Sequence, residues 1–562
     1  MVFVYPLCFL ATLGSSIRPA TASSGQPSGL RPSRPGPTPD SGSTMTQLSA
    51  AGDPQVAARG DEQGRWLVYL LIAITALGVV ARLRAYVSNR ALWIDEAMIS
   101  LNIIDRSFFE LLLTPLDYGQ LAPAGFLVAV KAASSLLGDG ERALRLVPLA
   151  AGLVALPLAF TVTRRIGGWR AAWFATAVIA VAPSAIYFST EVKQYETDLL
   201  ATLVALSLGL WAYRNELGAR SVAGLAGLGA LMVWLSHPVA LVLGGVGLAL
   251  LGQALTERRW RRALAVALVA GVWLANFVGG WIWGNQVANE MLVQREYFDG
   301  GFLPFPPLSL GELARWPELL LGLPAHVWHA SVGPLVSVPM SMLLLGVWLI
   351  GLLALWRSDR WIFAMFTLPI GLALLASMLE LYPLVKRLTV FLLPVLALPV
   401  ALALDWICRW RGDLRVPGIG LALAVLILPS MYAALAVARP FPREELREVL
   451  GFVADRARPG DLVWVFTRAI PSFRYYARSV APQTWGQLEV VEGEKYSPEG
   501  QLAEIRRVGG RQRVWCIFSH VENEERLLTF VLDDGGERLD SFLAAGASAY
   551  LYDLSDFTAA GT

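Results

Sequence analysis

Long apolar runs, joined by short connections that carry arginines, recur along most of the chain. A helix needs about 20 mostly apolar residues to cross the hydrocarbon core of a bilayer. The pattern therefore predicts a polytopic α-helical membrane protein with about eleven transmembrane helices. The expected spans are 66–85, 143–163, 169–188, 196–213, 221–236, 238–255, 263–283, 336–356, 361–379, 387–405 and 417–437.

A further apolar stretch, 121–137, is short and has Lys131 in its middle. If this stretch lies along the membrane surface, every connection with two to four arginines falls on one side, and such clusters favour the cytoplasm. We therefore expect the N-terminus to be cytoplasmic, and the loop 86–142 and the C-terminal domain to be outside. The arginine-bearing connections are 164–170, 214–220, 258–262, 357–360 and 409–415.

Two outer loops have patterns of their own. In the first loop, residues 97–113 place apolar side chains at helical spacing between charges, which predicts an interfacial helix, with 121–137 as a second one. The loop 284–335 is rich in Trp, Phe and Pro, and one hypothesis is that it closes as a lid over a site on this face.

The two ends of the chain differ from the apolar centre. Residues 1–60 are rich in Ser, Pro and Gly and predict a disordered leader, with Met45 as an alternative start. Residues 61–438 form the predicted membrane module, and 439–562 a small α/β domain outside the membrane. In that domain we expect a helix at 442–457 and strands at 462–466, 514–518 and 548–553.

Composition agrees with a membrane class and narrows the chemistry. The 562 residues are 55% apolar and 16% charged, whereas soluble domains are about one quarter charged. The net charge of +2 says little about partners, and no nucleic acid partner is expected. Three cysteines without a CxxC and four histidines without an HExxH predict neither a disulfide framework nor a zinc cluster. No metal ligand set is apparent and no cofactor is predicted, although a required divalent cation stays open.

Charged residues gather at three points on the predicted outer face. Asp95 and Glu96 follow the first span, where adjacent acids suit a general base and its partner, or a plain helix cap. The second loop, 189–196, packs acids, a lysine and a phenol between two spans. Lys386 and Arg387 open the tenth span, where they suit a phosphate or snorkel to lipid headgroups. His237, at another outer turn, suits either a site or a structural hydrogen bond.

The order of these motifs resembles the GT-C superfamily of membrane glycosyltransferases. More closely, it resembles the bacterial protein O-mannosyltransferase and aminoarabinose transferase members (glycosyltransferase family 39-like). The motifs are LWIDEA (92–97), RRIGG (164–168), APSAIYFSTEVKQYE (182–196) and YPLVKRLTVFLLP (382–394). Two features depart from the family: the second loop offers Glu191 and Glu196 in place of an Asp, and Pro123 stands alone where prolines are often paired.

The resemblance implies an inverting transferase on the outer face of a bacterial cytoplasmic (inner) membrane. Such an enzyme passes a sugar from a polyprenyl-phosphate carrier to a lipid, glycan or protein acceptor, and it contacts membrane lipids. The implied residues are Asp95, Glu96 and Glu191 as catalytic groups, Lys386, Arg387 and Lys193 on the donor phosphate, and Gln194, Tyr195, His237 and Tyr382 as substrate-binding groups.

Two other functions fit the membrane pattern. A transporter or flippase for lipid-linked sugars would place charges in mid-membrane and often shows inverted repeats. A non-catalytic assembly protein would use the outer domain to bind a partner. The rim position of the charged residues favours the transferase.

Overall fold

The computed structural model describes residues 54–287, 298–328, 334–410, 415–440, 442–521 and 523–557. Most of the predicted leader, with Met45, lies outside these residues. Residues 68–562 form one compact unit, separate from residues 1–67, so the predicted membrane module and the C-terminal sheet belong to the same unit.

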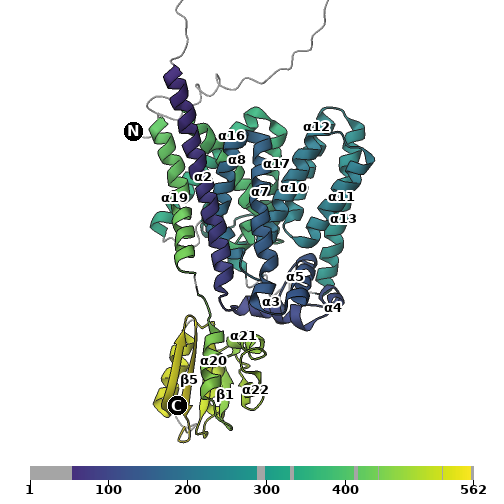
Figure 1. Ribbon diagram of the computed structural model, residues 1–562. Helices are drawn as coiled ribbons and strands as arrows, with labels where there is room; N and C mark the ends of the chain where they lie inside the picture. The colour runs from purple at the N-terminus through teal and green to yellow at the C-terminus, as the bar shows by residue number, and fades with distance from the viewer. Residues whose placement is uncertain are drawn as a thin grey trace, which may run out of the picture. The chain divides into compact units, whose positions relative to one another are not determined.

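Each predicted span corresponds to a helix (Figure 1). Among the described helices, eight are long and apolar enough to cross a membrane, and the chain is a multi-pass membrane protein. The helices are α2 (Pro54–Ser88), α7 (Leu146–Gly167), α8 (Trp169–Val181), α10 (Tyr195–Arg214), α11 (Ala219–Leu235), α12 (Val239–Thr256), α13 (Trp260–Val287), α16 (Pro334–Ser358), α17 (Arg360–Met378), α18 (Leu393–Ile407) and α19 (Arg415–Ala438).

Two predicted spans are interrupted near one end. The span at 169–188 breaks at Ala182, and Pro183 opens the short helix α9 (Pro183–Phe188). Proline suits this first helical position, because it lacks the N–H that would go unpaired there. The span at 387–405 begins as the 3₁₀ turn η4 (Lys386–Leu392) and becomes α-helical only in α18.

The first loop forms short helices at one end of the bundle. The single helix predicted at 97–113 is wrong in detail, because it divides into α3 (Ile94–Asp105) and α4 (Phe108–Leu113). Ser107 separates the two helices because it is the N-cap of α4. Its side chain accepts a hydrogen bond from the Glu110 N–H, and the Glu110 side chain accepts one from the Ser107 N–H. At 14 residues, α5 (Ala124–Leu137) spans only about 21 Å, too short to cross a core of about 30 Å. The remaining elements of this loop are η2 (Asp117–Gly119) and α6 (Glu141–Leu144).

The described part of the 284–335 loop contains η3 (Asp299–Gly301) and α15 (Leu310–Trp328). Residues 288–297 and 329–333 lie outside the described residues, and the lid stays a prediction.

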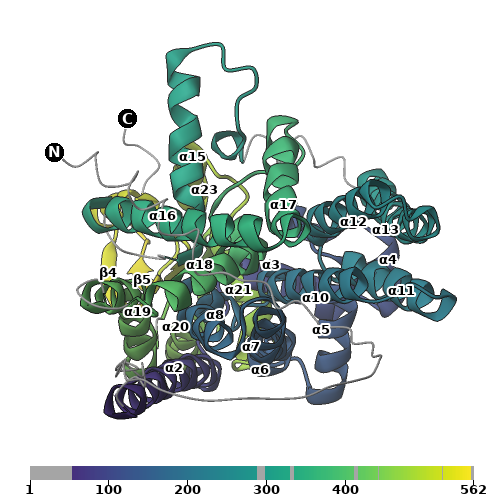
Figure 2. The same ribbon diagram turned by 90° about the horizontal axis from the view of Figure 1, so that it is seen from above.

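The central position belongs to α18, which lies beside α8, α16 and α10 in the view from above (Figure 2). In the apolar 18-residue window within 387–407, 89% of the residues are buried, whereas in the window within 260–280 of α13 the share is 22%. The turn η4 therefore begins the most enclosed helix of the bundle.

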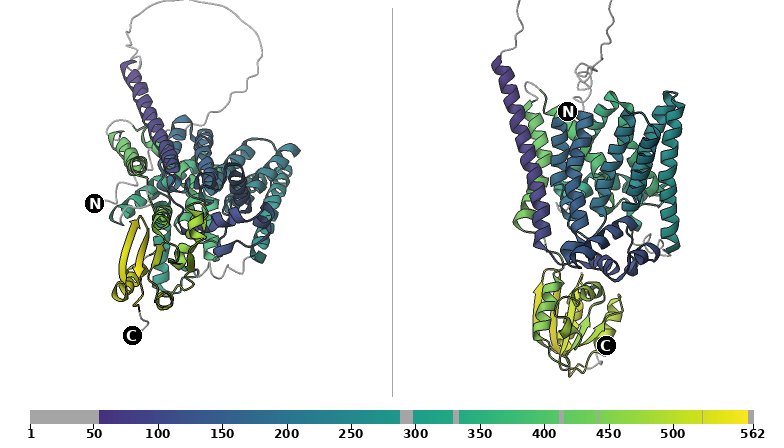
Figure 3. Two further views of the ribbon diagram at one scale, coloured as in Figure 1. Left: turned by 60° about the horizontal axis from the view of Figure 1, so that its bottom comes forward. Right: turned by 45° about the vertical axis from the view of Figure 1, so that its right-hand side comes forward.

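The C-terminal domain is a five-stranded sheet with strand order β2-β1-β3-β5-β4. β1 pairs in parallel with β2 and β3, and β5 pairs antiparallel with β3 and β4. In both views of Figure 3 this sheet lies at the same end of the bundle as the short helices of the first loop. Its elements are α20 (Leu446–Arg456), β1 (Leu462–Val465), η6 (Thr467–Ala469), α21 (Ile470–Tyr476), α22 (Pro482–Trp485), β2 (Glu489–Glu492), α23 (Pro498–Arg507), β3 (Val514–Ser519), α24 (Glu524–Gly535), β4 (Glu537–Ala544) and β5 (Ala547–Asp553).

Candidate active site

Asp95 lies in the first turn of α3 and pairs with Arg387 of η4, 292 residues away in the chain. Arg387 Nη1 donates to Asp95 Oδ2 at 2.6 Å. The two side chains are 20% and 24% exposed, respectively, so the pair is accessible from outside the fold. The N-cap of α3 is Trp93, so Asp95 is not the helix cap that the sequence analysis gave as the alternative to a general base.

Glu96, one residue further, is fully buried. Both of its oxygens accept from Arg145, at 2.9 and 2.7 Å, and Oε1 also accepts from the backbone N–H of Val192 at 2.8 Å. Burial raises the pKa of Glu96, but the charge and hydrogen bonds of Arg145 outweigh burial and hold it below its usual value. Glu96 thereby joins α3, the start of α7 and the second loop.

Glu191, in the second loop, is also fully buried. Its Oε1 lies 3.6 Å from Arg90 and 3.3 Å from Arg443, while no hydrogen-bond partner of Oε2 is found within the described structure. Burial raises the pKa of Glu191, and the Arg90 guanidinium opposes this shift.

Lys193 and its neighbours line the same region. The Lys193 ammonium donates to Gln120 Oε1 at 2.6 Å. Burial lowers the pKa of Lys193 to about 8, although the nearby Asp95 charge opposes the shift. Gln194 is half-buried, and its Oε1 has no hydrogen-bond partner among the described atoms, while Tyr195 is buried against Phe188 at 4.8 Å between ring centroids.

The remaining predicted residues are placed differently. Tyr382 donates to the backbone oxygen of Leu388 at 2.7 Å and so braces the turn that carries Arg387. Lys386 belongs to the same turn. His237 lies exposed in the turn between α11 and α12.

Arg90 of the first loop and Arg443, before α20, complete the cluster, and neither belongs to the sequence motifs. The guanidinium carbon of Arg443 lies 3.4 Å from the Trp93 ring centroid, and that of Arg387 lies 5.7 Å away. Arg443 also donates to the Tyr187 hydroxyl at 2.6 Å, and Arg90 lies over the ring of Tyr187 at 4.6 Å. The sequence signal for Arg443 was weak, since it stands among charged residues that look like a solvated linker.

A small cavity adjoins this cluster between α2, α9 and α19. Its walls are mostly apolar, and one side carries a guanidinium and phenol hydroxyls. The lining residues are Ala85, Ser88, Arg90, Ile186, Tyr187, Thr190, Tyr432, Ala436 and Pro440.

Metal binding finds no support in the geometry. Within the described ranges, no group of three or more His, Cys, Asp or Glu side chains is arranged to hold a metal ion.

The three carboxylates at this end of the bundle therefore differ in their exposure to solvent. Glu96 and Glu191 are enclosed, whereas Asp95 is reachable and stands beside a cation that suits a phosphate. Such a constellation can accept a proton from an incoming group and stabilise a departing anion.

The apolar spans, the short helices of the first loop and the C-terminal sheet define a multi-pass membrane protein with a GT-C-like fold. Two crystal structures of ArnT from Cupriavidus metallidurans share this fold. The structure bound to undecaprenyl phosphate matches with 14% identity and a TM-score of 0.50, over 88% of this chain and 99% of ArnT. The apo structure matches with 16% identity and a TM-score of 0.50, over 90% of this chain and 100% of ArnT. No protein-family model matches the sequence, and no curated protein matches it.

Proposed function

We propose that this chain is an inverting glycosyltransferase that moves a sugar from a polyprenyl-phosphate donor to an acceptor hydroxyl. The observation that carries the proposal is the accessible Asp95–Arg387 pair, which joins a general base to a phosphate-binding cation at 2.6 Å. The fold shared with ArnT, which was crystallised with undecaprenyl phosphate, supports this donor class.

In the proposed reaction Asp95 accepts the proton of the acceptor hydroxyl. The hydroxyl oxygen bonds to the anomeric carbon from the side opposite the phosphate, so the configuration inverts. The bond between the anomeric carbon and the phosphate oxygen breaks, and its electron pair leaves with the polyprenyl phosphate. Arg387, with Lys386 and Lys193, stabilises this departing negative charge.

The other site residues are assigned supporting roles. Glu96 holds Arg145 and the second loop in place, and Glu191 fixes Arg90 and Arg443. Gln194 and Tyr195 are assigned to the donor side, and the buried Gln194 Oε1, which has no hydrogen-bond partner among the described atoms, would accept from a hydroxyl of the sugar. His237, in the turn between α11 and α12, stays a predicted substrate-binding residue.

The ion pairs also weigh against the transporter. The buried charged side chains inside the described spans all lie toward helix ends. Arg82 lies near the end of α2 and Glu196 and Asp198 lie in the first turn of α10, and Arg82 Nη2 is 4.0 Å from Glu196. Arg262 lies in the first turn of α13 and Asp405 in the last turn of α18. A transport path needs such groups near the midplane.

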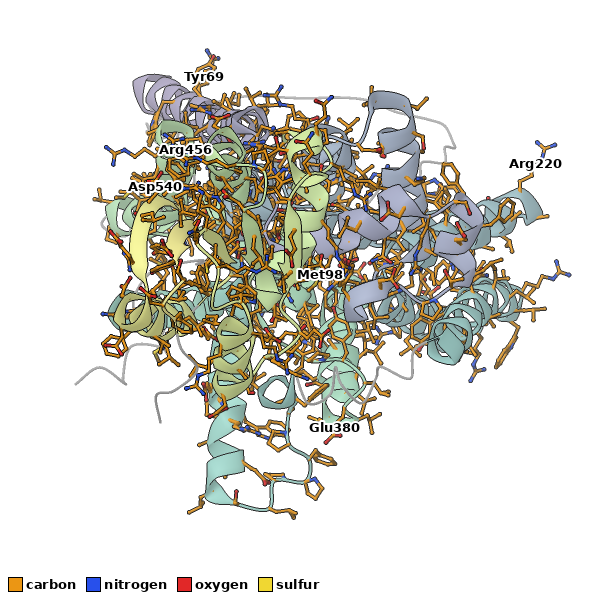
Figure 4. The ribbon with its side chains drawn as sticks, turned by 90° about the horizontal axis from the view of Figure 1, so that it is seen from below. Tyr69, Met98, Arg220, Glu380, Arg456 and Asp540 are labelled. Carbon is orange, nitrogen blue, oxygen red and sulfur yellow. The ribbon has the colours of Figure 1, made fainter. Side chains whose placement is uncertain are left out.

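Asp95→Asn tests the function. We expect transfer from radiolabelled polyprenyl-phosphate sugars to membrane extract to fall by about 10²–10⁴-fold, because the base is lost while the shape is kept. Asp540→Asn is the matched control, since this residue pairs with Arg456 at 3.4 Å on the exposed sheet domain (Figure 4). Full activity of Asp95→Asn would refute the proposed base. Movement of donor across liposomes without a covalent product would favour the transporter.

A further inference from the structure

A segment of the first loop packs against the edge of the C-terminal sheet where the parallel strands end. In open α/β sheets, ligands bind outside the carboxyl ends of parallel strands, where the strand order reverses. Here the chain passes from β1 to β2 on one side and then to β3 on the other, so the reversal falls between β1 and β3. His520, directly after β3, packs against Trp93 of the first loop, with 6.1 Å between the ring centroids. The position that usually receives a ligand receives the segment before Asp95.

The segment before α20 is fixed to this edge by backbone contacts. The Glu445 N–H donates to the backbone oxygen of Ala545, in the turn between β4 and β5, at 2.8 Å. Gly546 follows with a φ of +64°, and a Cβ there would lie 2.0 Å from the Arg443 carbonyl oxygen. The turn therefore requires glycine, and it holds Arg443, Glu444 and Glu445 in one place.

From this place, side chains of the domain bind the backbone N–H groups that precede Asp95. Ala91 donates to both oxygens of Glu445, at 3.3 and 3.2 Å, and Ile94 donates to Glu444 Oε2 at 3.0 Å. The hydroxyl of Tyr476, in α21, accepts from the Leu92 N–H at 2.6 Å.

These contacts replace a missing helix cap. The first N–H groups of a helix have no partner within it, and Ser, Thr, Asp or Asn normally supplies one from the N-cap position. The N-cap of α3 is Trp93, which makes no side-chain cap. Glu444 supplies the acceptor instead, from 350 residues further along the chain. Its other oxygen, Oε1, lies 2.7 Å from His520 Nδ1, which fixes the orientation of the carboxylate.

We propose that the C-terminal domain positions the proposed base, with Glu444 capping α3 and Glu445 and Tyr476 holding the residues before it. This inference rests on the proposed function only for its effect on turnover. Glu444, Glu445 and Tyr476 are positioning residues, since each acts on Asp95 through the backbone of residues 91–94.

The test combines two readouts in the full-length protein, using Glu444→Ala, Glu444→Gln and Tyr476→Phe. Hydrogen exchange of the peptide that covers residues 91–97 reports on the cap independently of any reaction. Steady-state transfer reports on turnover and on the KM for the donor. Glu489→Ala is the control, because Glu489 is an exposed carboxylate of β2 that pairs with Arg511 of the same domain at 3.1 Å.

We expect exchange in Glu444→Ala to quicken by about fivefold or more, the usual effect of losing a cap. Glu444→Gln keeps an acceptor oxygen and should stay near wild type, while Tyr476→Phe should release Leu92. The kcat of Glu444→Ala should fall about 10- to 100-fold with the donor KM unchanged, because a displaced base lowers the rate of the chemical step.

The outcomes separate this inference from the proposed function. Unchanged exchange in Glu444→Ala and Tyr476→Phe would overturn the capping role, whether or not the protein transfers sugar. Quickened exchange with an unchanged kcat would overturn positioning of the base. If exchange quickens in Glu444→Ala but the wild-type protein consumes no donor, the capping role of Glu444 would stand and the proposed transferase function would be refuted.

Discussion

Ion pairs at the two ends of the helix bundle differ in how far they are exposed to solvent. At the end that carries the proposed site, Glu96 and Arg145 are 0% and 2% exposed and meet in a bidentate pair. At the other end, Arg259 and Glu216 are 39% and 78% exposed and join two neighbouring connections. Charges removed from water interact strongly but are costly to separate, whereas exposed pairs contribute little. The difference indicates that the buried pair holds the elements around the proposed site in a fixed geometry, whereas the charges at the other end are solvated.

The largest effect should follow from Glu96→Ala, which leaves the Arg145 guanidinium buried without its carboxylate. We expect a loss of about 3–5 kcal/mol in the free energy of unfolding, because an uncompensated buried charge remains. Thermal unfolding in detergent measures the change. A stability equal to that of the wild type would show that Glu96 does not anchor the second loop.

Arg387→Ala should act on the donor rather than on the fold. We expect donor affinity to fall roughly 10- to 150-fold, the effect of losing a charge-assisted hydrogen bond, with little change in the KM for the acceptor. Titration with a polyprenyl phosphate measures the affinity. An unaltered titration curve would contradict the phosphate role of Arg387.

A smaller, pH-dependent effect should come from Lys193. Because burial lowers the pKa of Lys193 to about 8, its ammonium is charged below that pH and loses its proton as the pH rises through it. Donor affinity should therefore weaken between about pH 7 and about pH 9, whereas Lys193→Arg stays charged throughout this range and should remain flat. If donor affinity changed with pH equally in the wild type and in Lys193→Arg, the proposed role of Lys193 at the donor site would be refuted.

The smallest effect belongs to the opposite end. Arg259→Ala should change stability by at most about 1 kcal/mol and leave transfer intact, because its pair with Glu216 is exposed. The same unfolding and transfer assays apply. A loss comparable to that of Glu96→Ala would erase the contrast between the two ends.

Sequence patterns predicted a helix at each expected span, because membrane crossing requires long apolar runs, and eight of the described helices are long and apolar enough to cross. The patterns failed where structure depends on tertiary contacts. Strands β2 and β4 were missed because they are edge strands: β4 pairs only with β5, and many of its side chains face solvent, which leaves no apolar run. The break at Pro183 lies inside an apolar stretch that hydropathy alone treats as continuous.

The candidate site was predictable only in part. The motif order brought forward Asp95 and Arg387, which the fold places in contact. It did not reveal that Glu96 is enclosed with Arg145, since adjacent acids look alike in a sequence. Arg443 and Glu444 were overlooked because a charged linker gives no sign that its side chains reach another loop. Whether the site end faces outward stays a prediction from the distribution of arginines.

The capping of α3 by Glu444 also has a consequence for the order of biosynthesis. Ile94 leaves the ribosome early, but the carboxylate that accepts its N–H follows 350 residues later. At about 5–20 residues per second, this interval lasts roughly 18–70 s. During that time the early spans can insert while the segment before Asp95 still lacks its partners. A nascent chain should therefore become active only when its last domain arrives, and a prematurely terminated product would occupy the membrane without turnover.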